Sequence, residues 1–350
     1  MTYCPRSRVR IPAAVVAAGA LLLAGCSTDG TGDDASTIVR TTTAIAGAAV
    51  VGIERDTTAA CADPTPADRP GAGTHTVSHA GGESVVPDDP QRIVVLDPAA
   101  MDAVCALGLW ERVVGTTAGD LPGGHPQYLG TGVREIPVTG PIGAPDVEAI
   151  RAADPDLVLG SDPATASAAE LGAVAPTVFT GSDQVYWKNS FTVAGAALGR
   201  SKAAADALAS YEKDAADLGT ELGAGQTQAS LVQFDADSLS IEGPASFAGQ
   251  VLSDVGVRRP ADQRLTDAVD ADISNDIARA EGDLVYVVLS DDASKEHGEQ
   301  VMDGDEWQDL EAAVDNRVFV VDATVWGGNG LTAARAVLTD VRNSLNGYAS

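Results

Sequence analysis

The sequence predicts an α/β fold in which two Rossmann-like lobes with mostly parallel sheets are joined by one long connecting helix. Short β-branched runs alternate with apolar-periodic segments between residues 92 and 180. Such alternation is typical of a parallel sheet covered by helices on both faces. An unbroken helical pattern at residues 202–222 interrupts this alternation, which then resumes from residue 230 onward.

The first lobe is predicted from four strand-like runs and three helix-like segments. Pro145 stands near the start of the second helical segment, where a missing N–H is tolerated. The expected strands are 92–96, 111–115, 156–160 and 176–180, and the expected helices are 99–108, 145–153 and 164–174.

The connecting helix is expected from Lys202 to Leu222, a stretch without a helix breaker until Gly219. Its apolar residues fall on one face of a 3.6-residue period. About twenty helical residues span roughly 30 Å, the width of a small domain. The second lobe then follows as the segments 230–234, 238–243, 246–256, 272–280, 283–290, 307–316, 317–322 and 331–345.

The N-terminus has the layout of a secretory signal peptide. Three arginines up to Arg10 precede a short apolar run, residues 11–24, which contains no acidic residue. The sequence Leu-Ala-Gly-Cys that ends at Cys26 resembles a bacterial lipobox, in which the cysteine is acylated. The alternative is a signal peptide with a chance cysteine. No other window approaches eighteen consecutive apolar residues, so we expect a protein anchored outside the cytoplasmic membrane rather than spanning it.

Cysteine counting predicts one disulfide. Cys4 would leave with the signal peptide and Cys26 would be lipidated, which leaves Cys61 and Cys105. Two thiols in an oxidising compartment are expected to pair, and the pair would staple the N-terminal arm to the first helix of the folded body. The alternative is two free thiols, with Cys105 buried as a small apolar residue.

Composition shifts suggest five segments along the chain. Residues 27–90 are rich in Thr, Ala, Gly, Asp and Pro, with a weak ordered patch around residues 41–53. The expected segments are a signal peptide (1–25), a lipidated flexible spacer with the N-terminal arm (26–81), the first lobe (82–200), the connecting helix (201–222) and the second lobe (223–350).

Charge and motifs exclude several classes of function. The chain carries 22 basic and 50 acidic residues, a net charge of −28, so it has no basic stripe for nucleic acid. The patterns G-x-x-x-x-G-K-[ST], H-E-x-x-H and G-x-S-x-G are absent, which argues against an enzyme. An envelope scaffold without a small ligand is a further alternative, and we expect a monomer.

Four segments carry a resemblance to a known family: residues 92–109, 144–161, 171–180 and 305–326. They resemble the substrate-binding lipoproteins of iron-siderophore ABC importers, and most of all the actinobacterial ferric-dicitrate-binding-protein-like lipoproteins. The most specific piece is the pattern D-x-E-A-I-x-x-x-x-P-D-L-V-L. The resemblance extends from about residue 82 to the C-terminus and implies a ligand held between the lobes by a nearly rigid hinge.

For the ligand, the resemblance implies a ferric siderophore as transported cargo, with no permanent cofactor and no protein-bound metal. Flat aromatic side chains after predicted strands suit such ligands, and a guanidinium suits an anionic chelate. The alternative for each aromatic residue is packing within its own lobe. The candidate ligand-binding residues are Tyr128, Tyr186, Trp187, Phe247, Arg264 and Trp326. Haem or a corrinoid is the second ligand class, for which His125 or Tyr128 could serve as an axial ligand.

The resemblance also implies that the protein docks on an ABC permease. Members of the family present one acidic residue from each lobe to arginines of the permease. The matching positions are Glu148 in the first lobe and Asp276 in the second, where the family has a longer Glu. The alternative is that both are first-turn helix acids that favour the helix dipole.

Overall fold

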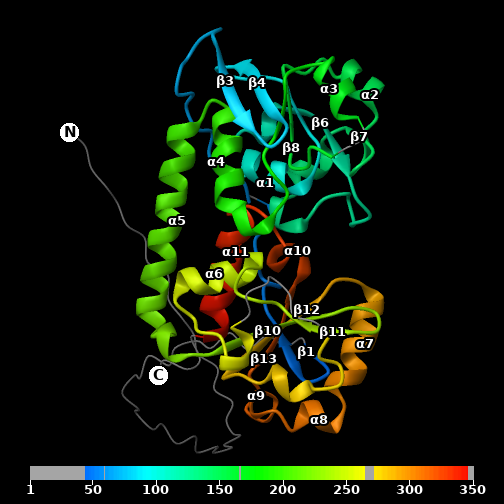
Figure 1. Cartoon of the computed structure of the whole chain (residues 1–350), viewed down its shortest axis with the longest axis vertical. Coiled ribbons are helices and arrows are strands. Elements are labelled where there is room, and N and C mark those ends of the chain that lie inside the picture. The colour runs from blue at the N-terminus through cyan, green and yellow to red at the C-terminus, as the bar shows by residue number, and fades with distance from the viewer. Residues whose placement is uncertain (1–43, 59, 165–166, 265–271, 346–350) are drawn as a thin grey trace, which may run out of the picture. The chain divides into compact units, whose positions relative to one another are not determined.

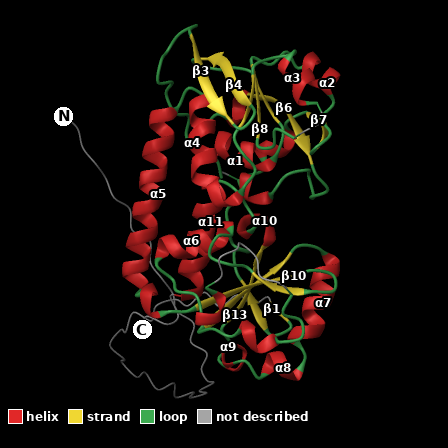
Figure 2. Cartoon of the chain, viewed as in Figure 1, coloured by secondary structure: helices red, strands yellow, loops and turns green. Residues whose placement is uncertain are grey.

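The computed structural model describes residues 44–58, 60–164, 167–264 and 272–345. The predicted signal peptide and Cys26 therefore lie outside the described residues. Two sheets lie near opposite ends of the long helix α5 (Ser201–Leu222), as Figure 1 shows and as the colouring of Figure 2 makes clear. This arrangement confirms the predicted two-lobed α/β fold.

The first lobe is built on a five-stranded parallel sheet with the order β7-β6-β5-β8-β9. Its central strands are fully buried, as expected for β-branched runs in a parallel sheet. The strands are β5 (Ile93–Val95), β6 (Val113–Ala118), β7 (Val138–Pro141), β8 (Leu157–Gly160) and β9 (Thr177–Phe179). The helices are α1 (Pro98–Ala106), α2 (Val147–Ala152), α3 (Ala168–Gly172) and α4 (Trp187–Ala197), with 3-10 turns η1 (Trp110–Arg112), η2 (Gln127–Leu129), η3 (Gly132–Glu135) and η4 (Gln184–Tyr186).

An antiparallel hairpin, β3 (Thr74–His79) and β4 (Gly82–Pro87), lies beside the first sheet. The backbone N–H of Ala80 at its turn donates to the carbonyl of Phe179 at 2.9 Å. The hairpin begins inside the stretch expected to be a flexible spacer.

The connecting helix α5 confirms the prediction almost to the residue. It begins at Ser201 and ends where Gly223 adopts a left-handed conformation with φ of 60°, a typical glycine C-cap. Its buried face holds Tyr211, Ala215 and Leu218. The helix packs against α4 of the first lobe and against α6 and α11 of the second lobe, so it joins the two lobes along its whole length.

The second lobe contains a six-stranded mixed sheet with the order β1-β2-β13-β12-β10-β11. Strands β2, β13, β12 and β10 are parallel, and the edge strands β1 and β11 are antiparallel to their neighbours. The strands are β1 (Ala44–Ile45), β2 (Ala48–Val50), β10 (Ala229–Phe234), β11 (Leu239–Ile241), β12 (Leu284–Leu289) and β13 (Val318–Asp322). The weak ordered patch of the N-terminal arm thus provides two strands of this sheet.

The helices of the second lobe are shorter than the sequence pattern suggests in two places. The segment 272–280 forms only one 3-10 turn, and 307–316 divides into two short helices because Leu310 has an extended backbone with ψ of 136°. The elements are η5 (Ala224–Gln226), α6 (Phe247–Val255), η6 (Ala261–Gln263), η7 (Ile277–Ala280), α7 (Asp292–Met302), α8 (Asp305–Gln308), α9 (Glu311–Val314), α10 (Ala323–Trp326) and α11 (Leu331–Leu345).

One cluster of buried apolar side chains runs from the first lobe through α4, α5, α6 and α11 into the second lobe. The lobes therefore share part of their hydrophobic core, which favours a stiff connection over a free hinge. Among the described residues, none of the helices has the length and hydropathy needed to cross a bilayer.

Candidate functional site

In the first lobe, a buried carboxylate lies at the carboxyl ends of the parallel strands. Asp97 follows β5 and caps α1 by accepting from the Ala100 N–H at 2.9 Å, and it also accepts from the Ser161 N–H at 2.6 Å. Burial raises the pKa of the Asp97 carboxyl, and these N–H donors oppose that shift. The same carboxylate therefore ties together the ends of β5 and β8, where ligands of open α/β sheets bind.

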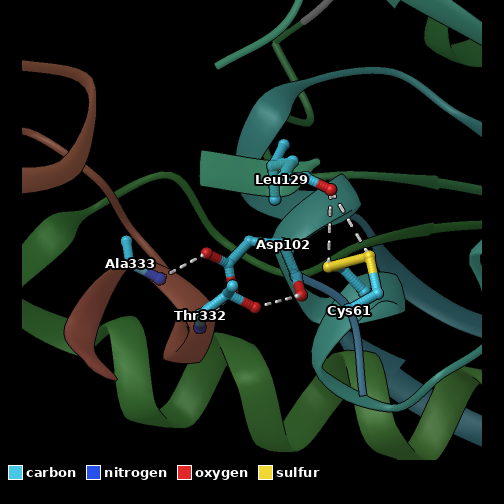
Figure 3. Close-up of a disulfide and its surroundings, with 6 residues drawn as sticks. Cys61, Asp102, Leu129, Thr332 and Ala333 are labelled. Atoms are coloured by element: carbon cyan, nitrogen blue, oxygen red, sulfur yellow. Dashed lines mark hydrogen bonds between the residues drawn. A yellow bond between two sulfur atoms is a disulfide. The ribbon is translucent and has the colours of Figure 1, made fainter. Parts of the chain in front are cut away.

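A second buried carboxylate, in the first lobe, accepts hydrogen bonds from the second lobe. Asp102 on α1 accepts from the N–H groups of Thr332 at 2.8 Å and Ala333 at 2.9 Å, which open helix α11 of the second lobe (Figure 3). A carboxylate at a helix N-terminus is stabilised by the exposed N–H groups and the helix dipole. A Cβ at Gly330 would lie 2.3 Å from the Asp102 Cγ, so glycine permits this close approach. Burial raises the pKa of Asp102 to about 6.

Tyr128 lies beside this contact on η2, which packs against α10 and α11. Its side chain is buried. Burial and the negative charges of Asp102 and Asp322 raise the pKa of Tyr128 well above its usual value. Tyr128 is thus packed where η2 meets α10 and α11 of the second lobe, and a role in ligand binding stays a prediction.

Two more candidates meet in an aromatic cluster between the lobes. Trp187, the first residue of α4, is 0% exposed and packs edge-on against Tyr211 and Phe247, each with a ring-centroid distance of 5.5 Å. The three residues come from α4, α5 and α6, so the cluster joins both lobes to the connecting helix. The Nε1 of Trp187 is buried without a hydrogen-bond partner. In this arrangement neither Trp187 nor Phe247 has a ring face open to a ligand.

Trp326 packs within the second lobe. It is 2% exposed, its ring lies 4.4 Å from that of Tyr286, and its Nε1 donates to Asp340 at 2.9 Å. Asp340 also accepts two bonds from Arg55 of the N-terminal arm, at 2.8 and 2.9 Å. The alternative anticipated for this tryptophan, packing within its own lobe, describes the observed contacts.

Tyr186 is the exposed candidate, with 62% of its surface accessible. It ends the turn η4, whose Gln184 side chain donates to the Gly327 carbonyl of the second lobe at 3.3 Å. The Gln250 side chain on α6 donates back to the Gln184 carbonyl at 3.0 Å. These bonds place the open ring of Tyr186 at the margin of the contact between the lobes.

The candidate arginine lies in the loop after α6. Arg264, which the sequence favoured, is exposed, and its Nε donates to the Arg259 carbonyl at 3.4 Å. Arg259 is instead the buried member of this loop: its Nη2 donates to the Glu242 carbonyl, and its Nε and Nη1 have no partner. Burial lowers the pKa of Arg259 to about 10, although the Glu242 charge opposes this.

His125 lies two residues before η2 and is buried, and neither ring nitrogen has a hydrogen-bond partner. Burial lowers its pKa, which favours the neutral imidazole. Within the ranges that the structure describes, no group of three or more His, Cys, Asp or Glu side chains gathers in a way that could hold a metal ion.

A small cavity lies where α1 and α4 of the first lobe meet the loop before α11. The cavity that remains between α1, α4 and the loop before α11 has a volume of about 10 Å³, the space of about one water molecule. The Oδ1 of Asn329 on this loop is buried without a partner. The residues that line the cavity are Ala99, Ala103, Thr180, Ser190, Phe191, Ala194, Asn329 and Gly330. A ligand larger than water can enter this cavity only if the elements around it move apart.

The two candidate docking residues are on the surface. The Glu148 side chain, in the first turn of α2, is 82% exposed and forms an ion pair with Arg151 at 3.5 Å. Asp276 is also exposed and precedes η7 without capping it through its side chain. Exposure is a requirement for docking, which stays a prediction.

Cys61 and Cys105 form a disulfide, which confirms the predicted pair. Figure 3 places it close to Asp102 on α1. The sequence pattern does not single out Asp102, although it is the one charged residue of the segment Pro98–Ala106 and lies on the buried face. The pair of Arg55 with Asp340 has no local sequence signal, because 285 positions separate the two residues.

Comparisons with known proteins agree with this architecture. The family model described as periplasmic binding protein matches residues 93–325. The probable siderophore-binding lipoprotein YfiY of Bacillus subtilis is 30% identical over 286 residues, which cover 77% of this chain and 86% of that protein. The petrobactin-binding protein YclQ of the same organism is 24% identical over 270 residues, 74% of this chain and 84% of that protein. The crystal structure of Staphylococcus aureus SirA complexed with staphyloferrin B superposes with a TM-score of 0.67 at 26% identity, covering 78% of this chain and 99% of that one.

Proposed function

Because this chain belongs to the periplasmic binding protein family, whose members are substrate-binding transport proteins, we propose that it captures a ferric siderophore between its lobes and delivers it to an ABC importer. YfiY and YclQ, which it matches over most of their length, are named for siderophore binding. The iron chelate is the cargo, and no permanent cofactor is needed for this function. The haem or corrinoid alternative is not favoured by these relatives.

The observation that carries the proposal is a set of unsatisfied polar atoms on the segments where the lobes meet. The Trp187 Nε1, both ring nitrogens of His125 and the Asn329 Oδ1 are buried without partners. Buried polar groups nearly always have partners, and an unmade hydrogen bond costs about 1–3 kcal/mol. Carboxylate, catecholate or hydroxamate oxygens of a siderophore would accept from the Trp187 N–H and from a protonated ring nitrogen of His125.

The proposed ligand contacts divide into two groups. Tyr186 offers its ring without any rearrangement because most of its surface is open. Tyr128, Trp187, Phe247 and Trp326 are buried, so their contact with a ligand requires the segments packed around them to move. Arg264 would add positive charge to a protein with a net charge of −28, which otherwise repels anionic chelates.

We further propose the chain organisation and the attachment predicted from the sequence. Residues 1–25 serve as a signal peptide, acylated Cys26 anchors the protein to the outer face of the membrane, and the two lobes occupy residues 82–200 and 223–350 on either side of the connecting helix. Glu148 and Asp276 contact arginines of the permease. Labelling with an alkyne fatty acid tests the anchor: Cys26→Ser should abolish incorporation and release the protein from the membrane.

Titration of the purified protein tests the proposed ligand class. The probes are ferric citrate, a ferric tris-catecholate, a ferric tris-hydroxamate and haemin, with intrinsic tryptophan fluorescence as the readout and the Soret band for haemin. We expect saturable quenching by one ferric chelate with a submicromolar dissociation constant, and no saturation by its iron-free form. Binding of haemin alone, or equal affinity for the iron-free chelate, would contradict the proposal.

A further inference from the structure

We propose that the N-terminal arm is a strap that spans the two lobes and restrains their separation, with the Arg55–Asp340 ion pair as its latch and the Cys61–Cys105 disulfide as its anchor. The strap consists of residues 48–58 and 60–65. In Figure 1 this blue segment runs from the lower sheet past α11 toward the upper lobe. The inference rests on the proposed function only in that lobe separation admits the ligand.

The first end of the strap is fixed to the second lobe. Strand β2 pairs in parallel with β13, and the Val51 N–H continues the ladder to the Val320 carbonyl at 3.0 Å. Arg55 then binds both carboxylate oxygens of Asp340 on α11, whose side chain is 0% exposed. Gly52 allows this approach, because a Cβ there would lie 2.7 Å from the Arg55 Nη2.

The other end of the strap is fixed to the first lobe. The Thr57 carbonyl accepts from the Thr131 N–H at 3.0 Å, and the disulfide joins Cys61 to α1. The N–H of Ala62 donates to the Cys105 carbonyl at 3.1 Å, and that of Thr65 donates to the Leu107 carbonyl at 3.2 Å. The buried Arg200 also donates to the Thr65 carbonyl at 2.9 Å, which ties the strap to the start of α5.

The crossing from one lobe to the other is very short. Asp56 alone separates Arg55, bound to the second lobe, from Thr57, bound to the first lobe. Since consecutive Cα atoms are 3.8 Å apart, two peptide links span at most about 7 Å. Separation of the lobes on this side must therefore break either the Arg55–Asp340 pair or the Thr57 hydrogen bond. Loss of the ion pair would leave the buried Asp340 carboxylate with only the Trp326 N–H, which is strongly unfavourable.

The disulfide keeps the strap attached to the first lobe if the hydrogen bond between Thr131 and Thr57 breaks. While it is intact, Cys61 holds the strap on α1, so the strap lengthens but stays attached to both lobes. Once the disulfide is reduced, the backbone bonds of Ala62 and Thr65 carry the attachment without a covalent link. Beneath the strap, the end of α1, η2 and α11 line a cavity of about 490 Å³. The strap covers this cavity and adds a connection between the lobes to the bonds of Asp102 with Thr332 and Ala333.

Amide hydrogen–deuterium exchange in the ligand-free protein tests the strap without assuming any ligand. The reporters are the N–H groups of Thr332 and Ala333, because their acceptor is Asp102 of the other lobe. In Arg55→Gln we expect their exchange to be at least tenfold faster, with unchanged exchange in strand β12. Arg151→Gln, which removes an exposed ion pair within the first lobe, is the matched control and should leave both regions unchanged.

Reduction of the disulfide in the wild-type protein provides a second, independent change. After reduction we expect exchange at Thr332 and Ala333 to become faster while exchange in β12 stays unchanged. This is the same pattern as the one expected for Arg55→Gln. Unchanged exchange at both reporters would overturn the proposal. An equal increase at the reporters and in β12 would also overturn it, because the strap would then support global stability and not the contact between the lobes. Failure of the siderophore titrations would leave all of these outcomes intact.

Discussion

At the scale of single residues, the contacts between segments distant in sequence depend on a few buried carboxylates, each supplied with hydrogen-bond donors. Asp102 accepts from the first turn of α11, and Asp340 accepts from Arg55 and Trp326. A buried charge is tolerated only when it is paired or hydrogen-bonded. These residues therefore specify how the distant parts of the chain meet, and each makes the contact sensitive to a single substitution.

The raised pKa of Asp102 predicts a pH-dependent contribution to stability. The folded pKa of about 6 exceeds the usual 3.8, so the folded state binds the proton more tightly between these values. The free energy of unfolding should therefore fall as the pH rises from about 4 to about 6, by roughly 3 kcal/mol for this group. The measurement is urea unfolding of wild type and Asp102→Asn across this range. The difference in the free energy of unfolding between wild type and Asp102→Asn should shrink or reverse as the pH rises. A difference that stays constant across this range would contradict a raised pKa of Asp102. Tyr128, which faces this group, is unchanged in both proteins.

Tyr186 is the residue whose loss should change binding without changing the fold. Its ring is largely exposed, so Tyr186→Ala should alter the free energy of unfolding by less than about 0.5 kcal/mol. Loss of aromatic stacking should weaken binding of the ferric chelate by about 5- to 10-fold, as measured by fluorescence titration. Tyr186→Phe should retain the affinity. Val314→Ala, at a similarly exposed site remote from the lobe contact, serves as the control.

At the scale of elements, several features follow from local sequence and others do not. The uninterrupted pattern from residue 202 to 222 is enough to predict α5, since propensity and amphipathic period agree there. The arm strand β2 is only three residues long and pairs with β13 some 270 positions away, so no local pattern could reveal its partner. The sequence correctly places Trp187 after the carboxyl end of strand β9. Its burial, however, depends on Tyr211 and Phe247 from two other helices. Tertiary contacts of this kind decide which candidates reach a ligand.

We expect the Cys61–Cys105 disulfide to contribute measurably to the free energy of unfolding. It closes a loop between residues separated by 44 positions, which in the chain-entropy model stabilises the fold by about 4 kcal/mol. Cys61→Ser combined with Cys105→Ser should lower the free energy of unfolding in urea by about this amount. Reduced wild-type protein should match the double variant. A loss below about 1 kcal/mol would mean that the unfolded chain is not appreciably restrained by the loop.

At the scale of the whole molecule, the described part of the chain is two α/β lobes that share one core along α5 and contact each other through polar groups elsewhere. Its surface is strongly acidic, with a net charge of −28. Acidic faces would suit the proposed docking on arginines of a permease, because charge complementarity speeds encounter and fixes orientation. The fold could thus be predicted from alternation and the long helix, whereas the polar contacts between the lobes, such as that of Asp102 with the start of α11, could not.

Charge reversal at the proposed docking residue should separate transport from binding. Glu148→Lys should lower uptake of the iron chelate about tenfold in cells that express the chain with its own permease, while leaving the affinity of the purified protein unchanged. The side chain is 82% exposed, so folding should not be affected. Glu170→Lys, at an exposed first-turn position of α3 in the same lobe, is the matched control. Equal loss of uptake in both variants would point to a general charge effect.

The most direct test of the central claim is to locate iron in crystals grown with the ferric chelate that binds most tightly, using anomalous diffraction at the iron edge. We predict one strong anomalous peak between the two lobes, with the chelate in contact with Tyr186 and with the Trp187 N–H. A peak confined to the outer surface of one lobe, or no peak in crystals of a protein that binds the chelate in solution, would contradict capture between the lobes.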